Sequence, residues 1–305
     1  MKPRHAGRNR GLLAVHSGAL GDVILFGRLL EMTPGPRTLI ASGQKASLLK
    51  TAGVVQETLD FDLLPMHEVF SSTPLDQCRL AGMLGGFDRL ISCLGGGGDE
   101  PSQRLSSLCG CAQATFLPVR PPARYDGHLV SLWLEMLGVA GPVSAAPWRF
   151  PASSADAYDG CTFIHPGSGG ADKCWPLCLF LELADVLQSS GHKPVFILGP
   201  VELDRLDTAV VEELERRHSV LRSPSLARLA GLLARCRLYV GNDSGVSHLA
   251  AVAGASCVVL FGPSSSRHFA PIGPKVTVIQ APDMSQIGLD AVVRSASIAS
   301  GTGML

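Results

Sequence analysis

Several turns of this sequence place glycine, serine and charged side chains directly after apolar runs. In VGNDSGVSHLAAVAG, residues 240–254, the residues Asp243, Ser244 and Gly245 stand at an expected helix start. The first N–H groups of a helix lack intrahelical acceptors and carry partial positive charge, so this start could bind a phosphate. Ordinary helix capping explains the same residue types, and both interpretations stay open at this point.

The same expected helix continues with Ser247 and His248. Ser244 and Ser247 could donate hydrogen bonds to phosphate oxygens, and His248 falls four residues after Ser244, on the same helical face. A single helical histidine is more often a structural residue. A binding role for His248 therefore stays open.

A second turn, HPGSGGADKCWP at 165–176, follows another apolar run. Ser168 and Gly169 lie among small residues that let backbone N–H groups approach an anion closely. Lys173 adds a compact positive charge. The pattern predicts an anion site, against the alternative of a flexible loop with a surface lysine.

Two further turns carry acids. In HSGALGDVIL at 16–25 only Gly18 and Gly21 are present, whereas a dinucleotide fingerprint needs a third glycine, which disfavours a nicotinamide-dependent oxidoreductase. Asp22 at the helix start could be a general base, or could only complement the helix dipole. In LGPVELDR at 198–205, Glu202 could cap a helix or accept hydrogen bonds from sugar hydroxyls.

These turns connect apolar strands to amphipathic helices in regular alternation. We expect strands at 12–17, 37–42, 88–94, 161–165, 193–199, 237–241, 256–262 and 275–280, and helices at 22–32, 43–53, 128–138, 179–191, 202–218, 244–254 and 285–299. Alternation of this kind predicts α/β units with parallel sheets, in which ligands bind at the turns after the strands.

A segment rich in Pro, Ala and Ser at 139–157 interrupts the alternation. We interpret it as an interdomain linker, with one edge strand as an option. The sequence therefore predicts two Rossmann-like domains that face each other across a cleft. An N-terminal acceptor-binding domain spans 1–150 and a C-terminal nucleotide-sugar-binding domain spans 151–305, with the option that the last helix packs back on the first domain.

Composition excludes several other classes of protein. The 26 basic and 26 acidic residues cancel, so no global field favours nucleic acid. No apolar stretch reaches transmembrane length. The nine cysteines lack zinc-site spacing, so we expect no metal site and a reduced, cytoplasmic protein. The basic start of the chain (Lys2, Arg4, His5, Arg8 and Arg10) reads as a tail, or as a contact with an anionic membrane.

Four motifs, taken together and in their order along the chain, resemble those of glycosyltransferase family 9, the ADP-heptose:lipopolysaccharide heptosyltransferases. They are GALGDVIL, HPGSGG..K.WP, LGP.E and GNDSGVSHLA. The resemblance runs from Gly11 to about Lys275 and implies a GT-B fold. It implies that Asp22 is the catalytic base, that Lys173 serves catalysis at the diphosphate, and that Gly18 and Gly21 lie on the acceptor side. The implied donor-binding residues are Ser168, Gly169, Glu202, Asp243, Ser244, Gly245, Val246, Ser247 and His248.

The activity implied by the resemblance is inverting transfer of heptose from ADP-heptose to a hydroxyl of a lipopolysaccharide-core-type acceptor. It needs no cofactor and no metal, and a lipid-linked acceptor is compatible with peripheral association at the inner membrane face. The segment 56–70 has no Lys or Arg, whereas members specific for lipopolysaccharide carry several basic residues in the N-terminal domain. Arg104, Arg120 and Arg124 are the candidate substitutes. A non-catalytic nucleotide-binding module is the alternative from another class of protein.

Overall fold

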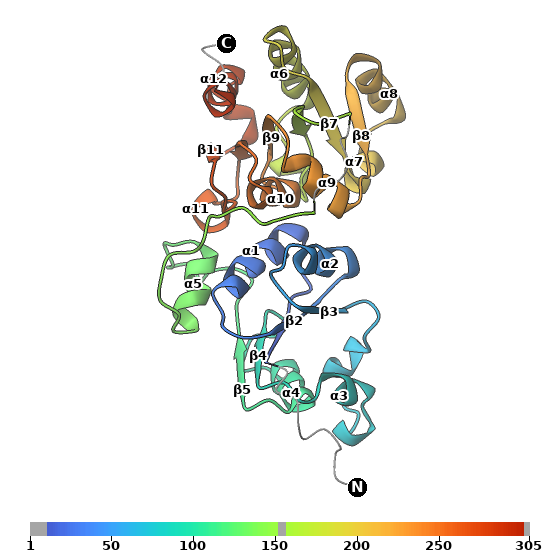
Figure 1. Ribbon diagram of the computed structural model, residues 1–305, viewed down its shortest axis with the longest axis vertical. Helices are drawn as coiled ribbons and strands as arrows, with labels where there is room; N and C mark the ends of the chain where they lie inside the picture. The colour runs from blue at the N-terminus through green and yellow to red at the C-terminus, as the bar shows by residue number, and fades with distance from the viewer. Residues whose placement is uncertain (1–10, 152–156, 302–305) are drawn as a thin grey trace. The chain divides into compact units, whose positions relative to one another are not determined.

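The structure is a computed structural model that describes residues 11–151 and 157–301. The chain divides into two compact units, Met1–Val143 and Ser144–Leu305. Each unit contains one parallel sheet with helices packed on it (Figure 1), which confirms the predicted fold class of two Rossmann-like α/β units. The basic residues of the tail lie outside the described residues.

In the N-terminal unit the described strands form one sheet in the order β3-β2-β1-β4-β5, and all neighbours are parallel. The strands are β1 (Leu12–Val15), β2 (Arg37–Ala41), β3 (Glu57–Asp60), β4 (Arg89–Ser92) and β5 (Gln113–Phe116). The helices are α1 (Leu20–Glu31), α2 (Gly43–Thr51), α3 (Arg79–Leu84), α4 (Glu100–Cys109) and α5 (Leu129–Met136), with short 3₁₀ turns at Met66–Phe70 and Leu75–Gln77.

The first strand is central in this sheet because its sequence, LLAV, is entirely apolar and every side chain is buried. A strand covered on both faces needs such a continuous apolar run. Helix α1 follows directly and packs against α5, where Phe26 meets Trp133 edge to face at 5.9 Å. This packing holds the turn between β1 and α1, which carries the expected general base.

In the C-terminal unit the described strands follow the order β11-β10-β9-β6-β7-β8, again all parallel. The strands are β6 (Thr162–His165), β7 (Pro194–Leu198), β8 (Ser219–Arg222), β9 (Leu238–Asn242), β10 (Cys257–Phe261) and β11 (Val276–Gln280). The helices are α6 (Leu177–Ser189), α7 (Pro200–Arg205), α8 (Thr208–Arg217), α9 (Leu226–Leu233), α10 (Gly245–Ala253), α11 (Ser266–Phe269) and α12 (Leu289–Ser300), with 3₁₀ turns at Ala171–Lys173 and Met284–Gln286.

Counted from its first strand, this sheet has the dinucleotide-binding order 3-2-1-4-5-6, with the switch point between β6 and β9. One face of the sheet is covered by α6, α8 and α12, whose apolar side chains form a single cluster with Ile164, Phe196 and Val240. Helices α9 and α10 pack against each other, and α10 also packs on β9 and β10. The last helix, α12, contacts α6 and strands β9 to β11 of its own unit.

Some predicted elements were wrong in detail. The expected helix at 202–218 is two helices, because Leu206 has extended backbone and Asp207 begins α8 as its N-cap. The linker contains no strand among its described residues. Edge strands β3, β5 and β8 were not predicted, since their sequences (ETLD, QATF and SVLR) lack a continuous apolar run.

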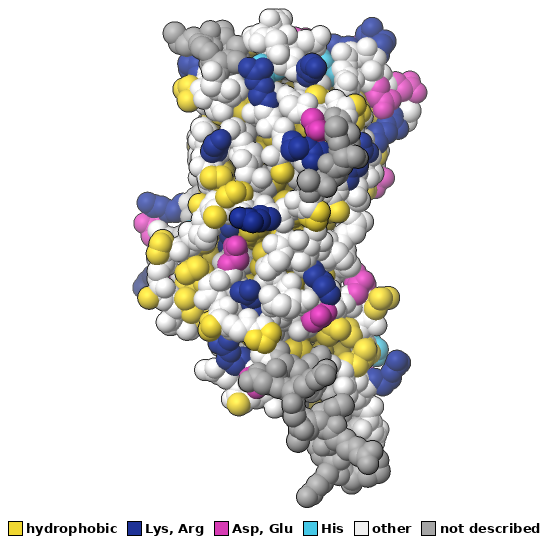
Figure 2. All heavy atoms as spheres, viewed as in Figure 1, with side chains coloured by type: hydrophobic (Ala, Val, Ile, Leu, Met, Phe, Trp, Pro, Cys, Tyr) yellow, Lys and Arg dark blue, Asp and Glu magenta, His cyan; other side chains and the backbone are white. Residues whose placement is uncertain are grey.

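No helix among the described residues is both long enough and apolar enough to cross a membrane. On the face drawn in Figure 2, basic and acidic side chains are interspersed, and the basic ones take up more of the face.

Candidate functional site

The candidate site in the C-terminal unit lies at the carboxyl ends of its strands, at the switch point between β6 and β9. Parallel sheets of this order bind ligands there, because the connections on either side of the switch point run to opposite faces and leave a crevice. The loop at 166–173 follows β6, and the start of α10 follows β9. These two segments bring most of the predicted donor-binding residues together.

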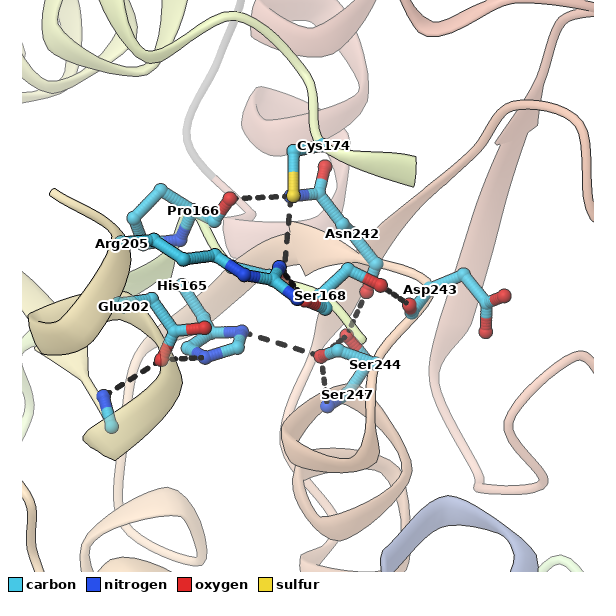
Figure 3. Close-up of polar contacts among 12 residues, drawn as sticks. His165, Pro166, Ser168, Cys174, Glu202, Arg205, Asn242, Asp243, Ser244 and Ser247 are labelled. Carbon is cyan, nitrogen blue, oxygen red and sulfur yellow. Dashed lines mark hydrogen bonds and ion pairs between the residues drawn. The ribbon is translucent and has the colours of Figure 1, made fainter. Parts of the chain in front are cut away.

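Ser168 joins the two segments directly. Its buried hydroxyl donates a hydrogen bond of 2.6 Å to the carbonyl oxygen of Asp243 (Figure 3). Gly169, the next residue, is exposed, and a Cβ at this position would meet no atom within 4 Å. The loop therefore has its serine turned into the protein and its glycine turned outward.

Lys173 and Asp243 form an ion pair with an Nζ–Oδ2 distance of 3.0 Å. The same carboxylate oxygen accepts a hydrogen bond of 2.7 Å from the hydroxyl of Ser264, in the turn after β10. The carboxylate is 10% exposed and the lysine side chain 36% exposed. An ammonium group has three N–H donors, so Lys173 can serve this pair and still donate to a ligand.

Trp175 anchors the chain just beyond Lys173. Its indole is 1% exposed, donates from Nε1 to the carbonyl oxygen of Ile287 at 2.8 Å, and meets Phe180 edge to face at 4.9 Å. Its backbone N–H donates to Oδ1 of Asn242 at 3.1 Å. The Trp-Pro part of the motif is therefore a core anchor that fixes the base of the loop.

Asn242, the last residue of β9, is fully buried and links β9 to the loop after β6. Besides accepting from Trp175, its amide donates to the carbonyl oxygen of Pro166 at 2.7 Å and to that of Gly167 at 3.4 Å. A buried amide with donors and acceptor all engaged holds its partners in one arrangement.

Glu202 lies below the same loop, at the start of α7. Its carboxylate accepts from the N–H of Gly199 at 2.8 Å and lies 3.5 Å from Nε2 of His165. Burial opposes ionisation, but the hydrogen bond and charge of His165 and the Gly199 N–H outweigh it and lower the pKa of Glu202. Residue 167 of the loop packs directly against this carboxylate and must be glycine, because a Cβ there would lie 1.8 Å from Oε1 of Glu202.

Helix α10 begins at the site with Ser244 as its N-cap. The hydroxyl of Ser244 accepts from the N–H of Ser247 and lies 3.2 Å from Nδ1 of His165, which thereby connects Glu202 to the helix start. The backbone N–H groups of Gly245 and Val246 donate to no group among the residues that the structure describes. Both residues are partly exposed, so these two donors are open to a ligand.

Two predicted site residues of α10 have their side chains in the interior. Ser247 is fully buried, and its hydroxyl bonds the carbonyl oxygen of Asn242 and the hydroxyl of Tyr239, the latter at 2.9 Å. His248 is 4% exposed. Ser247 thus bonds two residues of β9 and supports the helix start from within, whereas His248 is buried one residue later in the same helix.

The candidate site of the N-terminal unit lies at the matching position, in the turn after β1. Asp22 is half-buried in the first turn of α1, and its Oδ2 accepts from the N–H of Ala19 at 3.1 Å. Gly18 receives a hydrogen bond of 2.6 Å at its carbonyl oxygen from Lys45, and Gly21 is buried. The three predicted residues of this turn thus share one short, hydrogen-bonded segment.

His16 precedes that segment and shapes it. Its Nδ1 accepts from the N–H of Gly18 at 2.9 Å, and its ring packs on Phe26 with centroids 5.2 Å apart. Burial, and secondarily the charge of Lys45, lower the pKa of His16 to about 4. The imidazole is therefore neutral near pH 7 and acts as an acceptor for the turn.

The candidate acceptor arginines differ in their surroundings. Arg104 donates to the carbonyl oxygen of Glu68 at 2.6 Å, to that of Thr73, and to the hydroxyl of Ser71 at 3.3 Å. It therefore stabilises the neighbouring loop. Arg120 and Arg124 are exposed.

Sequence reasoning missed the residues that hold this site in shape. Asn242, Ser264 and His165 stand beside the motif residues in the sequence. Their polar side chains at the ends of apolar strands could have identified them as part of the site. Arg205 gave no signal. It lies on α7, 36 residues from Gly169, yet its guanidinium donates to the carbonyl oxygens of Ser168 and Gly169 at 2.9 and 2.8 Å.

Relatives with similar sequences are heptosyltransferases. Lipooligosaccharide heptosyltransferase 2 of Haemophilus influenzae is 30% identical over 116 residues, which cover 36% of this chain and 33% of that protein. Lipopolysaccharide heptosyltransferase 2 of Escherichia coli is 28% identical over 154 residues, which cover 49% of this chain and 43% of that protein. The chain thus matches these curated relatives over a third to less than half of their length.

Solved structures of similar fold cover nearly the whole chain. The glycosyl transferase family 9 structure from Veillonella parvula is 22% identical, with a TM-score of 0.76 over 95% of this chain and 97% of that one. The E. coli ADP-heptose lipopolysaccharide heptosyltransferase II is 18% identical, with a TM-score of 0.71 over 95% of this chain and 98% of that one. The family model for glycosyltransferase family 9 (heptosyltransferase) matches residues 143–291. This chain therefore carries a glycosyltransferase family 9 domain over residues 143–291, as the resemblance of its motifs predicted.

Proposed function

We propose that this chain is an inverting glycosyltransferase that moves a sugar from a nucleoside diphosphate to a hydroxyl group of a saccharide acceptor. The donor's diphosphate binds in the C-terminal unit, at the start of α10 and beside the loop after β6. One observation carries this proposal: the N–H groups of Gly245 and Val246 have no acceptor among the described residues, and they stand with Lys173 at the switch point of the sheet.

The identity of the donor is inferred from relatives. Solved structures of an E. coli heptosyltransferase, 20% identical to this chain, hold ADP in one case and ADP-2-deoxy-2-fluoro heptose in another. We infer that ADP-heptose is the donor here. The acceptor is then a lipid-linked saccharide of the lipopolysaccharide core, which puts the reaction at the cytoplasmic face of the inner membrane.

The proposed chemistry divides between the two units. Asp22 accepts the proton of the acceptor hydroxyl while that oxygen attacks the anomeric carbon of the donor, and the bond from this carbon to the diphosphate oxygen breaks. The negative charge that develops on the leaving ADP is stabilised by Lys173 and by the free N–H groups of α10. Preorganised donors of this kind are worth about 3–4 kcal/mol each in transition-state stabilisation.

The proposal includes independence from divalent metal. Lys173 and the helix start supply the positive charge that a divalent ion supplies elsewhere, since the partial charge at a helix N-terminus is roughly half a unit. Turnover should therefore continue in EDTA. Loss of turnover in EDTA, with recovery on addition of Mg²⁺, would contradict this part.

The acceptor's anionic groups are assigned to Arg120 and Arg124. Both side chains are exposed, whereas Arg104 is engaged with the loop near Glu68. Alanine at positions 120 and 124 should raise KM for a phosphorylated acceptor and leave ADP affinity unchanged. An unchanged acceptor KM would remove these two arginines from acceptor binding.

The central experiment replaces Asp22 by Asn and measures two quantities on the full chain. Turnover of ADP-heptose with a core saccharide, followed by mass spectrometry, should fall by about 100-fold or more, since general-base catalysis contributes about that much. The Kd for ADP, by calorimetry, should stay within twofold. Asp76→Asn, at an exposed residue of the same unit, is the matched control. Near-normal turnover of D22N would exclude Asp22 as the base.

A further inference from the structure

The carbonyl oxygens of the loop after β6 are occupied by donors of the protein itself. The guanidinium of Arg205 donates from Nη1 to Ser168 and from Nη2 to Gly169, at 2.9 and 2.8 Å. The next carbonyl oxygen, that of Gly170, accepts from the N–H of Lys173 at 3.2 Å and from the thiol of Cys174 at 3.4 Å. Three consecutive carbonyl groups are thus fixed in direction.

A fixed carbonyl also fixes the N–H group of the same peptide unit. The described peptide bonds are trans, and in a trans peptide the C=O and N–H bonds point in opposite directions. Because the carbonyl groups of Ser168 and Gly169 point at Arg205, the N–H groups of Gly169 and Gly170 point away from it. Neither N–H donates to any group in the described part of the chain, and Gly169 is exposed.

A single turn of α7 holds the loop from below. Glu202 fills the space under Gly167, and Arg205, three residues later, reaches the two carbonyl groups that follow. On the other side Ser168 is tied to the carbonyl oxygen of Asp243 (Figure 3). The peptide units between Ser168 and Gly170 therefore have little freedom to rotate.

We propose that Arg205 is a positioning residue that aims the N–H groups of Gly169 and Gly170 at the diphosphate of the donor. This inference rests on the proposed function for its ligand, and it adds a second pair of backbone donors to the pair at the start of α10. The nearby charges are Lys173 and Arg205 on the positive side, and Asp172, Glu202 and Asp243 on the negative side, with Asp243 paired to Lys173. Glycine at 169 and 170 lets an anion approach these donors closely.

The test compares Arg205→Gln and Arg205→Lys with the wild type, using ADP, adenosine and inorganic pyrophosphate as calorimetric probes. Lysine keeps the charge but cannot span both carbonyl groups. In both variants the Kd for ADP and for pyrophosphate should rise by about tenfold, and the Kd for adenosine by less than twofold. Only the diphosphate contacts the oriented N–H donors. Arg216→Gln is the control, since Arg216 is an exposed arginine bound to Glu213.

Three results would overturn the inference. Full affinity of R205K for ADP would mean that the charge of residue 205 acts without orienting the loop. Equal losses for adenosine and ADP would indicate general disorder of the site. Unchanged ADP affinity in R205Q would exclude any role.

Nuclear magnetic resonance of ¹⁵N-glycine-labelled protein separates this inference from the proposed function. Pyrophosphate should shift the amide signals of Gly169 and Gly170 in the wild type and not in R205Q. If the wild type binds pyrophosphate through these amides and fails to bind ADP, the proposed donor is wrong and the role of Arg205 stands. If it binds ADP with both amides unperturbed, the proposed function stands and the role of Arg205 is refuted.

Discussion

Replacing Gly167 by Ala tests how tightly the loop after β6 is held against α7. A Cβ at this position would lie 1.8 Å from Oε1, 2.2 Å from Cδ and 2.6 Å from Cγ of Glu202, whereas ordinary contacts begin at 3.4 Å. The glutamate carboxylate must therefore retreat by about 1.6 Å, the difference between 3.4 and 1.8 Å. Glu202 is 8% exposed, so it has little room to move.

The cost follows from the hydrogen bonds that such a movement breaks. Retreat of the carboxylate separates it from the Gly199 N–H, now 2.8 Å away, and from His165. Loss of a hydrogen bond to a charged group costs about 1.5–3 kcal/mol, and the lower chain entropy of unfolded alanine returns about 0.4–1 kcal/mol. The free energy of unfolding should fall by about 0.5–2.6 kcal/mol, the difference between these two ranges. Gly169→Ala meets no atom within 4 Å and should stay within about 0.5–1 kcal/mol of the wild type.

Urea unfolding of the full chain, followed by tryptophan fluorescence, measures both variants against the wild type. Hydrogen exchange of the Gly199 amide gives a local readout, which should speed up in G167A and not in G169A. In an E202A background the substitution of Gly167 should cost less than about 0.5 kcal/mol, because the clashing side chain is gone. Equal stabilities of G167A and G169A, with unchanged exchange at Gly199, would refute the packing argument.

Two further substitutions test other parts of the fold. His16 is neutral when folded and protonates near pH 6.5 when unfolded, so its contribution to stability is complete above pH 6.5 and is lost as the pH falls toward 4. His16→Asn should therefore flatten the pH dependence of the unfolding free energy in this window, by up to about 3 kcal/mol, and an unchanged slope in urea titrations would contradict the burial argument. Asn242→Ala leaves the buried Trp175 N–H and Pro166 carbonyl without partners, so unfolding free energy should fall by about 2–4 kcal/mol; a loss below 0.5 kcal/mol in the same assay would show that the amide is dispensable.

The sequence by itself determined the alternation of strands and helices and the turns in which the polar residues stand. Apolar runs such as LLAV and CVVLF predict buried parallel strands, because a strand covered on both faces cannot tolerate charge. Glycine, serine and acid after such a strand predict a ligand-binding turn, since ligands bind at that edge of the sheet. The order of the motifs also indicated the family, and the match of the family model to residues 143–291 confirmed it.

Only the tertiary structure decided which side chains face outward and which hold the site together. Asp243 meets Lys173, 70 residues away, and Ser264, 21 residues away, while Arg205 reaches carbonyl groups 36 and 37 residues away. Ser247 turns inward because it bonds Tyr239 and Asn242 of β9, and His248 is buried beside it. Spacing along a chain specifies neighbours only within one helix or strand, and the partners across elements depend on strand order and on how each helix is rotated on its sheet.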